Sequence, residues 1–275
     1  FVNHWVKPIR YSLEYLEKSQ QLCIESGNLH LAGATGAFIG LTQYLKGDNL
    51  EQVKEGIERQ LTFAKKHEYA ISNDYLSELL DWIDVLSSPE KQPTWKFSEF
   101  TDDKSAAIIH KTTRLQMAYL FNHRSQEISL IEELEPLVDN TMVLIVAPDY
   151  FLYHSLWIIK LIEEKEITRR RGLSKLKANL KKLQKWAKQS PANYLHKYLL
   201  ILAEYQKLTS QDNQAIVNYH QAIENAEENG FLQDVAIANH CAANFYLAKQ
   251  FPKTAKSFVT EAYNGYINWG AVHVA

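Results

Sequence analysis

Cysteine, methionine, proline and glycine are all scarce in this chain of 275 residues, which contains 2, 2, 7 and 10 of them. The two cysteines, Cys23 and Cys241, are far apart in the sequence, and neither belongs to a CxxC pair. Such isolated cysteines lack the paired spacing of a zinc site or a disulfide framework. Both lie among apolar residues at helical spacing, so we predict two buried free thiols in a reducing compartment such as the cytoplasm.

Long apolar runs and an excess of one charge are also missing. The longest apolar stretch, Met142–Pro148, is too short to span a bilayer. The net charge of −2 gives no overall case for nucleic acid or a membrane surface as partner. Hydrophobic residues make up 46% and charged residues 23%, as in a globular protein. No basic segment followed by an apolar one comes after Phe1, so we expect no signal peptide and interpret Phe1 as an internal position of a longer protein.

The spacing of the apolar residues predicts helices almost throughout, because they recur every three or four residues and glycine and proline fall between the periodic segments. The predicted helices cover residues 8–26, 29–45, 50–67, 73–86, 105–122, 126–138, 148–162 and 173–187, with helix hairpins after them. Residues 88–104 predict a long loop, and Arg169–Gly172 is interpreted as a basic hinge. We expect two units, an N-terminal set of helical repeats over residues 1–168 and a C-terminal set over residues 169–275.

The last third of the chain contains an internal repeat with a period of forty residues. Four positions correspond: Ala203 and Ala243, Ala215 and Ala255, Tyr219 and Val259, and Ala222 and Ala262. Small residues are needed where antiparallel helices press together, and the larger residue fills the space between one hairpin and the next. Tetratricopeptide repeats, with a period of about 34, are built in this way. We therefore predict an all-α, tetratricopeptide-like α-solenoid of antiparallel helix hairpins. The alternative is an ordinary helical bundle in which the alanines recur at this spacing by chance.

Several stretches, taken together, resemble one known family. The most specific ones are WAKQSPANY (186–194) with HKY (196–198), AIENA (222–226) with NGF (229–231), and AY (262–263) with Tyr266 and WGA (269–271). They resemble the helical segment of large multidomain signalling proteins, in which a Ser/Thr-kinase-like domain and a STAND-type AAA ATPase precede it and a GAF domain and a histidine kinase follow it. The family usually has phenylalanine where Tyr194 stands, and a basic residue soon after Ala271, where Val272 follows here.

The resemblance implies a connector and scaffold for signal transduction without an active site of its own. Its partners would be neighbouring domains of the same chain or a protein or peptide, not nucleic acid and not a membrane, and a homodimer stays open. A free-standing tetratricopeptide-like protein that binds a peptide is the alternative function.

Motifs that carry chemistry are absent from the sequence. It has no GxxxxGK[ST], GxGxxG, HExxH or GxSxG. His220 and His240 are the best histidine pair for a metal, but they lack i,i+4 spacing and a carboxylate placed to complete a site. Tyr153, His154 and Ser155 are adjacent, so they point to different faces of a helix and cannot form a relay. We expect no catalytic residue, no cofactor and no metal ligand.

Charged and aromatic clusters allow two further predictions. The segment Lys160–Lys188 contains eleven basic and three acidic residues, which favours a solvated face or a docking surface for an acidic domain and leaves RNA or DNA open. Acidic runs at Glu132–Glu135 and Glu163–Glu164 are interpreted as solubilising.

The final helix has no polar cap, so we expect a coupling element with Tyr266 or Trp269 exposed. The alternative is that these two rings fold back onto the preceding hairpin.

Overall fold

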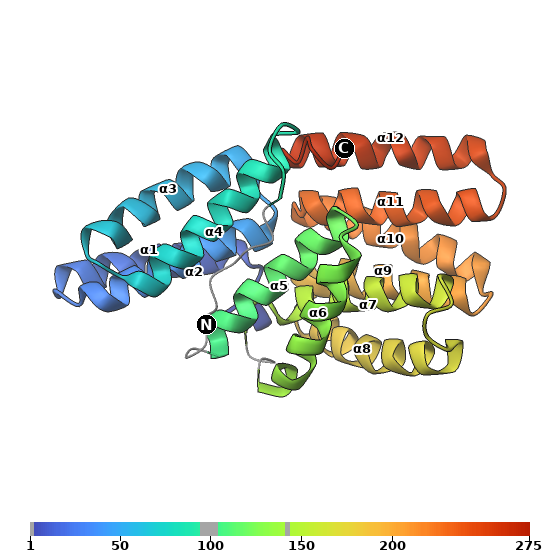
Figure 1. Cartoon of the computed structure of the whole chain (residues 1–275), viewed down its shortest axis with the longest axis horizontal. Helices are drawn as coiled ribbons and strands as arrows, with labels where there is room; N and C mark the ends of the chain where they lie inside the picture. The colour runs from blue at the N-terminus through green and yellow to red at the C-terminus, as the bar shows by residue number, and fades with distance from the viewer. Residues whose placement is uncertain (1–2, 94–103, 141–143) are drawn as a thin grey trace.

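The computed structural model describes residues 3–93, 104–140 and 144–275, and these residues form α-helices with no β-strand among them (Figure 1). The helices are α1 (Arg10–Glu25), α2 (Leu29–Lys46), α3 (Leu50–Lys66), α4 (Ala70–Ser87), α5 (Lys104–Leu120), α6 (Arg124–Leu134), α7 (Ala147–Glu163), α8 (Arg169–Gln189), α9 (Pro191–Leu208), α10 (Asp212–Asn229), α11 (Leu232–Ala248) and α12 (Pro252–Trp269). Two short 3-10 helices, η1 (Asn3–Trp5) and η2 (Glu135–Asn140), precede α1 and follow α6. Consecutive helices pack as hairpins, so the predicted all-α fold is confirmed. Within these residues, no helix combines the length and the hydropathy that a membrane span requires.

Local side-chain chemistry sets several helix ends where the sequence predicts them. Asn28 caps α2, since its Oδ1 accepts a hydrogen bond from the backbone N–H of Leu31 at 3.2 Å. The same helix ends on Gly47, which has a left-handed φ of 81°. A side chain at position 47 would also collide with Gln233 of α11. The left-handed backbone conformation therefore favours glycine at position 47, and Gln233 packs closely over it.

The predicted hinge at Arg169–Gly172 is wrong, because these residues form the first turn of α8. Thr168 is the N-cap, and its Oγ1 accepts a hydrogen bond from the backbone N–H of Arg171 at 3.4 Å. Gly172 is buried, and a side chain there would meet Ile162 of α7. The glycine thus permits close packing of α7 and α8 rather than bending.

Two other predicted segments differ in extent from the structure. The helix predicted to reach residue 138 ends at Leu134 and continues as η2, because Pro136 lacks the N–H that a further α-helical turn requires. Of the predicted loop at 88–104, residues 94–103 lie outside the described part of the chain. Residues 88–93 are not helical, and Lys104 already belongs to α5.

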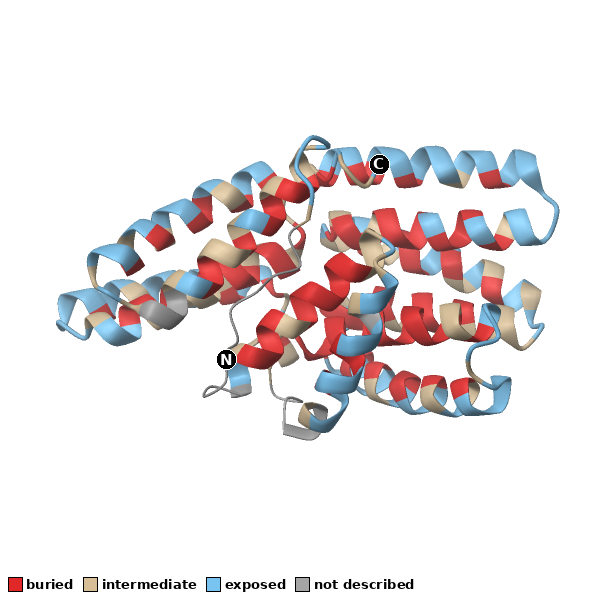
Figure 2. Ribbon diagram, viewed as in Figure 1, coloured by how far each residue is buried: buried red, intermediate tan, exposed pale blue. Residues whose placement is uncertain are grey.

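Helix α7 lies in the interior of the molecule (Figure 2). Every residue from Ala147 to Ile159 is buried, because α5, α8 and α9 pack around it. Its polar side chains Asp149, His154 and Ser155 are buried together with the apolar ones. The predicted boundary between the units 1–168 and 169–275 falls between α7 and α8, which pack against each other. The division into these two units stays a prediction.

The segment before α1 packs on the second half of the chain. Asn193 of α9 accepts a hydrogen bond from the backbone N–H of Ile9 at 2.8 Å and donates one to the carbonyl of His4 at 2.7 Å. The ring of Trp5 stacks on Trp186 of α8 with 5.4 Å between centroids. Hydrogen bonds and ring contacts therefore join residues that are more than 180 positions apart.

The C-terminal end packs on the first helices, and the expectation that Tyr266 or Trp269 is exposed is wrong. Both side chains are buried. Trp269 lies against Tyr44 of α2, with 6.2 Å between ring centroids. The backbone N–H of His273 donates to the carbonyl of Leu86 in α4 at 2.9 Å. Trp269 is covered by the first helices, a contact that helical periodicity does not predict. Tyr266 lies against His240 of α11 with 6.4 Å between ring centroids, as the alternative of rings folded back onto the preceding hairpin predicts.

A buried charge cluster joins α4 and α5. Arg114 binds Glu78 through two hydrogen bonds of 2.7 and 2.8 Å, and Nδ1 of His110 lies 2.8 Å from the same carboxylate. Burial by itself would raise the pKa of Glu78, but the hydrogen bonds and charges of His110 and Arg114 lower it to about 2. The cluster therefore favours the ionised carboxylate and links the two helices across the segment that connects them.

We expect overpacking when Ala222 is replaced by leucine. Ala222 is buried beside Leu200 of α9 and Ala238 of α11, so Ala222→Leu should lower the free energy of unfolding by about 1–3 kcal/mol in urea titrations. Ala178→Leu, on the exposed face of α8, is the matched control, because alanine and leucine have similar helix propensities. Equal stability of the two variants would contradict close packing at Ala222.

The Glu78 cluster predicts a loss of stability in acid. The carboxyl group has a lower pKa in the folded state, about 2, than in the unfolded chain, about 4.3. Its contribution is therefore complete above about pH 4.3 and is lost as the pH falls toward 2. Between pH 5 and pH 2, the free energy of unfolding should therefore fall by on the order of 2–3 kcal/mol less in Glu78→Gln than in the wild-type chain. Urea titrations across this pH range measure the difference. An unchanged pH dependence in the variant would rule out the low pKa.

Candidate functional site

A groove of about 550 Å³ opens between the first helices of three consecutive hairpins, α7, α9 and α11. We call it the inner groove. Its lining residues are Tyr119, Leu120, Asn122, Leu156, Ile159, Lys160, Glu163, Glu204, Lys207, His240, Cys241, Asn244, Ala248, Tyr266 and Val274. Tyr119 and Leu120 belong to α5, and Asn122 follows it, so the end of α5 also borders the groove. A volume of this size is within the range of ligand pockets in proteins.

A half-buried lysine with two carboxylates is the main charged feature of the inner groove. Nζ of Lys207 lies 2.8 Å from the carboxylate of Glu163 and also pairs with Glu204. Glu204 accepts a further hydrogen bond of 2.6 Å from the hydroxyl of Tyr219. Burial by itself would lower the pKa of Lys207, but Glu204 and Glu163 raise it above its usual value. The lysine therefore stays charged and paired, and it connects α9 with α7.

Other polar groups in the groove are more accessible. Asn244 of α11 is exposed there, and so is His240, whose Nδ1 lies 3.5 Å from the hydroxyl of Tyr266. Asn122 accepts a hydrogen bond from Lys160. Amide and imidazole groups can donate and accept hydrogen bonds, as the backbone of a bound peptide requires. The groove thus combines aliphatic walls with polar groups suited to a peptide.

Cys241 lines the groove but does not have the features of a nucleophile. Both Cys241 and Cys23 are buried free thiols, which confirms that prediction. Burial raises the pKa of Cys241 well above its usual value, so the reactive thiolate form is disfavoured.

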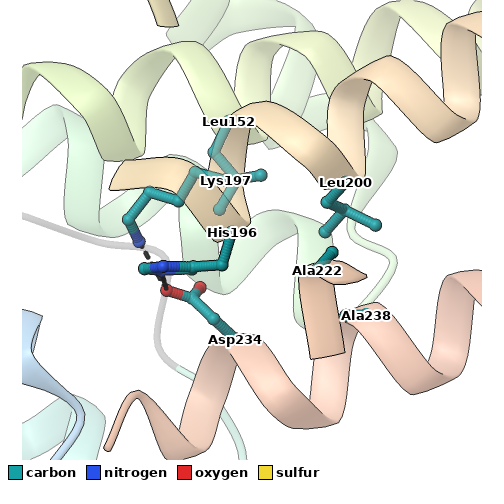
Figure 3. Close-up of a pocket in the computed structure, with 7 residues that line it drawn as sticks. All are labelled: Leu152, His196, Lys197, Leu200, Ala222, Asp234 and Ala238. Carbon is teal, nitrogen blue, oxygen red and sulfur yellow. Dashed lines mark hydrogen bonds and ion pairs between the residues drawn. The ribbon is translucent and has the colours of Figure 1, made fainter. Parts of the chain in front are cut away.

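A second charged cluster lies deeper, where α7, α9 and α11 meet (Figure 3). Nζ of Lys197 lies 2.9 Å from Asp149 of α7 and 2.6 Å from Asp234 of α11. Nε2 of the neighbouring His196 lies 2.8 Å from Asp234. All four side chains are buried. The space that His196, Lys197 and Asp234 line together with Leu200 is too small for a water molecule. We call this set the inner ion cluster.

The electrostatics of the inner ion cluster favour a charged lysine. Burial alone would lower the pKa of Lys197, but Asp149 and Asp234 raise it. The pKa of Asp234 is lowered in turn, because Lys197 and His196 outweigh the effect of burial. Burial lowers the pKa of His196, which favours the neutral imidazole. Because these paired charges are buried, the cluster holds α7, α9 and α11 together.

The residues that the sequence singled out for chemistry have other partners. His220 packs edge-on against Phe258 of α12. Among the described residues, no three metal-ligating side chains come together. The hydroxyl of Ser155 donates to the carbonyl of Phe151 at 2.6 Å, and Asn179 of α8 donates to both Ser155 and His154. These buried groups join α7 to α8.

The predicted acidic runs form ion pairs between helices in addition to facing solvent. Glu133 lies 2.7 Å from Lys111 of α5, and Glu135 pairs with Lys175 of α8. Glu164 lies 3.3 Å from Arg124 at the start of α6. The carboxylates of Glu133 and Glu135 therefore tie α6 and η2 to α5 and α8.

The basic segment forms the outer face of α8, as its apolar stripe predicts. Nine basic residues and no acidic ones lie between Arg169 and Gln189, and the strip Lys177, Lys181 and Lys185 is exposed. Lys182 is closer to the core, 4.6 Å from the ring centroid of Phe151.

Sequence reasoning missed the lysines that organise both charge clusters. In the sequence, Lys197 stands out only as part of a stretch that resembles the family, whereas Glu204 and Lys207 are spaced i,i+3. That spacing is a usable signal for a pair on one helix. The partners on other helices have no such signal, since Lys197 and Asp149 are 48 residues apart.

Removal of Lys197 should be strongly destabilising. Lys197→Met leaves Asp149 and Asp234 buried without their cation, so we expect a loss of about 3–5 kcal/mol in the free energy of unfolding. Urea titration at pH 7 measures it. Lys188→Met, at an exposed position of α8, makes the same chemical change and should alter stability by less than about 0.5 kcal/mol. Similar values for both variants would exclude a role of the cluster in stability.

The comparison with known proteins agrees with the hairpin architecture. Residues 115–264, which extend from α5 into α12, match a protein family described as CHK1-like, TPR repeats. No curated protein matches the chain. The match covers more than half of the 275 residues and includes the inner groove helices α7, α9 and α11. This chain therefore belongs to the family of CHK1-like tetratricopeptide (TPR) repeats.

Proposed function

We propose that this chain is a non-catalytic TPR-like module for protein–protein or interdomain interaction, and that it transmits signals within a multidomain kinase or ATPase. The observation that carries the proposal is the inner groove, with its volume of about 550 Å³ between α7, α9 and α11. Helical repeat proteins use such extended inner surfaces to bind partners. The clustered charges near it are already paired within the chain, so they serve packing instead of chemistry.

The signalling context rests on the resemblance of residues 186–198, 222–231 and 262–271 to the helical segment of multidomain kinases. In this proposal the groove binds a segment of a neighbouring domain or a peptide in the cytoplasm. A free-standing TPR-like peptide-binding protein is the alternative, since the same groove serves both functions. The complete open reading frame of the gene separates the two, because only the first predicts kinase-like and ATPase domains beside this segment.

Peptide binding by the inner groove is testable with peptides selected from a displayed library against the whole chain. Asn244→Trp fills the groove from an exposed position, so it should weaken the selected peptides at least about tenfold in calorimetric titrations. Asn264→Trp is the matched control, because Asn264 is exposed on α12 and does not line the groove. Equal affinities for both variants would place the binding site elsewhere, and a library that yields no binder would contradict peptide binding itself.

A further inference from the structure

Helices α10 and α12 are equivalent members of the forty-residue repeat, and they differ in what covers one flank. Tyr219 of α10 corresponds to Val259 of α12, and Ile223 corresponds to Tyr263. On α10 these side chains are only 0% and 9% exposed. They are covered because α11 packs on α10, with the ring of Tyr219 5.5 Å from that of Phe245.

On α12 the corresponding flank is open. Val259 is 49% exposed, Tyr263 52% and Ile267 36%. These residues follow one another at intervals of four, so they lie on one side of the helix; we call them the α12 stripe. The opposite flank is packed, since Phe258 stacks on Tyr246 of α11 at 5.1 Å. Helix α12 lies at the edge of the molecule with an exposed outer side (Figures 1 and 2).

The contact between α10 and α11 indicates which kind of surface fits the α12 stripe. Helix α11 presents a small residue and a large ring to α10. Ala238 borders the same small space as Ala222, and the ring of Phe245 is tilted by 49° against that of Tyr219. Polarity differs at two places along this flank: the half-buried Ile216 of α10 corresponds to the exposed Lys256 of α12, and the exposed Glu227 corresponds to Ile267. An acidic side chain beside Lys256 would complete such a contact.

We propose that the α12 stripe binds an amphipathic α-helix of a partner protein. The apolar side of that helix carries an alanine and an aromatic residue spaced as Ala238 and Phe245 are, and an acidic residue next to it faces Lys256. The bound helix repeats on α12 the packing of α11 on α10. This inference rests on the proposed function as an interaction module and assigns it a second surface, distinct from the inner groove.

The test uses a synthetic peptide with the sequence of α11, residues 232–248, and the whole chain. Fluorescence anisotropy of the labelled peptide should show saturable binding, weakened at least about tenfold by Tyr263→Glu on the chain and by Phe245→Ala in the peptide. Asn264→Glu places the same charge on the neighbouring exposed residue of α12, outside the stripe, and should leave the affinity unchanged.

Three outcomes would overturn the inference: no peptide binding, an affinity insensitive to Tyr263→Glu, or a dimer formed through the stripe that excludes the peptide. Binding that is insensitive to Tyr263→Glu would mean that the peptide exchanges with the chain's own α11. Sedimentation of the wild-type chain and of Tyr263→Glu identifies the dimer. Asn244→Trp, measured in parallel with groove peptides, reports on the inner groove alone, so failure of the stripe and failure of the proposed function are distinguishable.

Discussion

The ion pairs of Lys197 are the interaction on which the arrangement of the inner helices depends. This residue of α9 binds Asp149 of α7 and Asp234 of α11, and all three side chains are buried. Moving any of the three helices away would leave a buried charge without its partner. Both aspartates also lie in the first turn of their helices, where the helix dipole favours an anion. Helices α7, α9 and α11 also form the walls of the inner groove, so the inner ion cluster fixes the distance between those walls.

The contacts between the two ends of the chain are connected to this cluster. Gln233, the neighbour of Asp234, donates to the carbonyl of Leu45 at the end of α2 at 3.0 Å. One turn of α11 therefore holds both the inner ion cluster and a contact with the first helices. The first helices also cover Trp269 at the end of α12. This contact buries Trp269, while the outer flank of α12, with Val259 and Tyr263, stays exposed.

The fold was largely predictable, because the signals for helices act over a few residues. Apolar spacing predicts most of the helices, and Asn28 and Gly47 mark the ends of α2 through their own hydrogen bonds and dihedral angles. The error at Arg169–Gly172 arose from taking charge and glycine as signs of flexibility, although Thr168 provides an ordinary N-cap. Similarly, Pro136 was a local signal for the end of α6 that the apolar period concealed.

The sequence by itself thus determined the helices, their ends and the forty-residue repeat, since caps and periodicity depend on neighbours along the chain. Only the tertiary structure decided which charges meet and which aromatic rings are covered. Lys197 and Asp149 belong to different helices, and no rule of spacing relates them. Equivalent positions of the repeat even have opposite exposure, as Tyr219 and Val259 do. Burial depends on what packs against a residue, and a repeat in the sequence specifies the residue but not its neighbour in space.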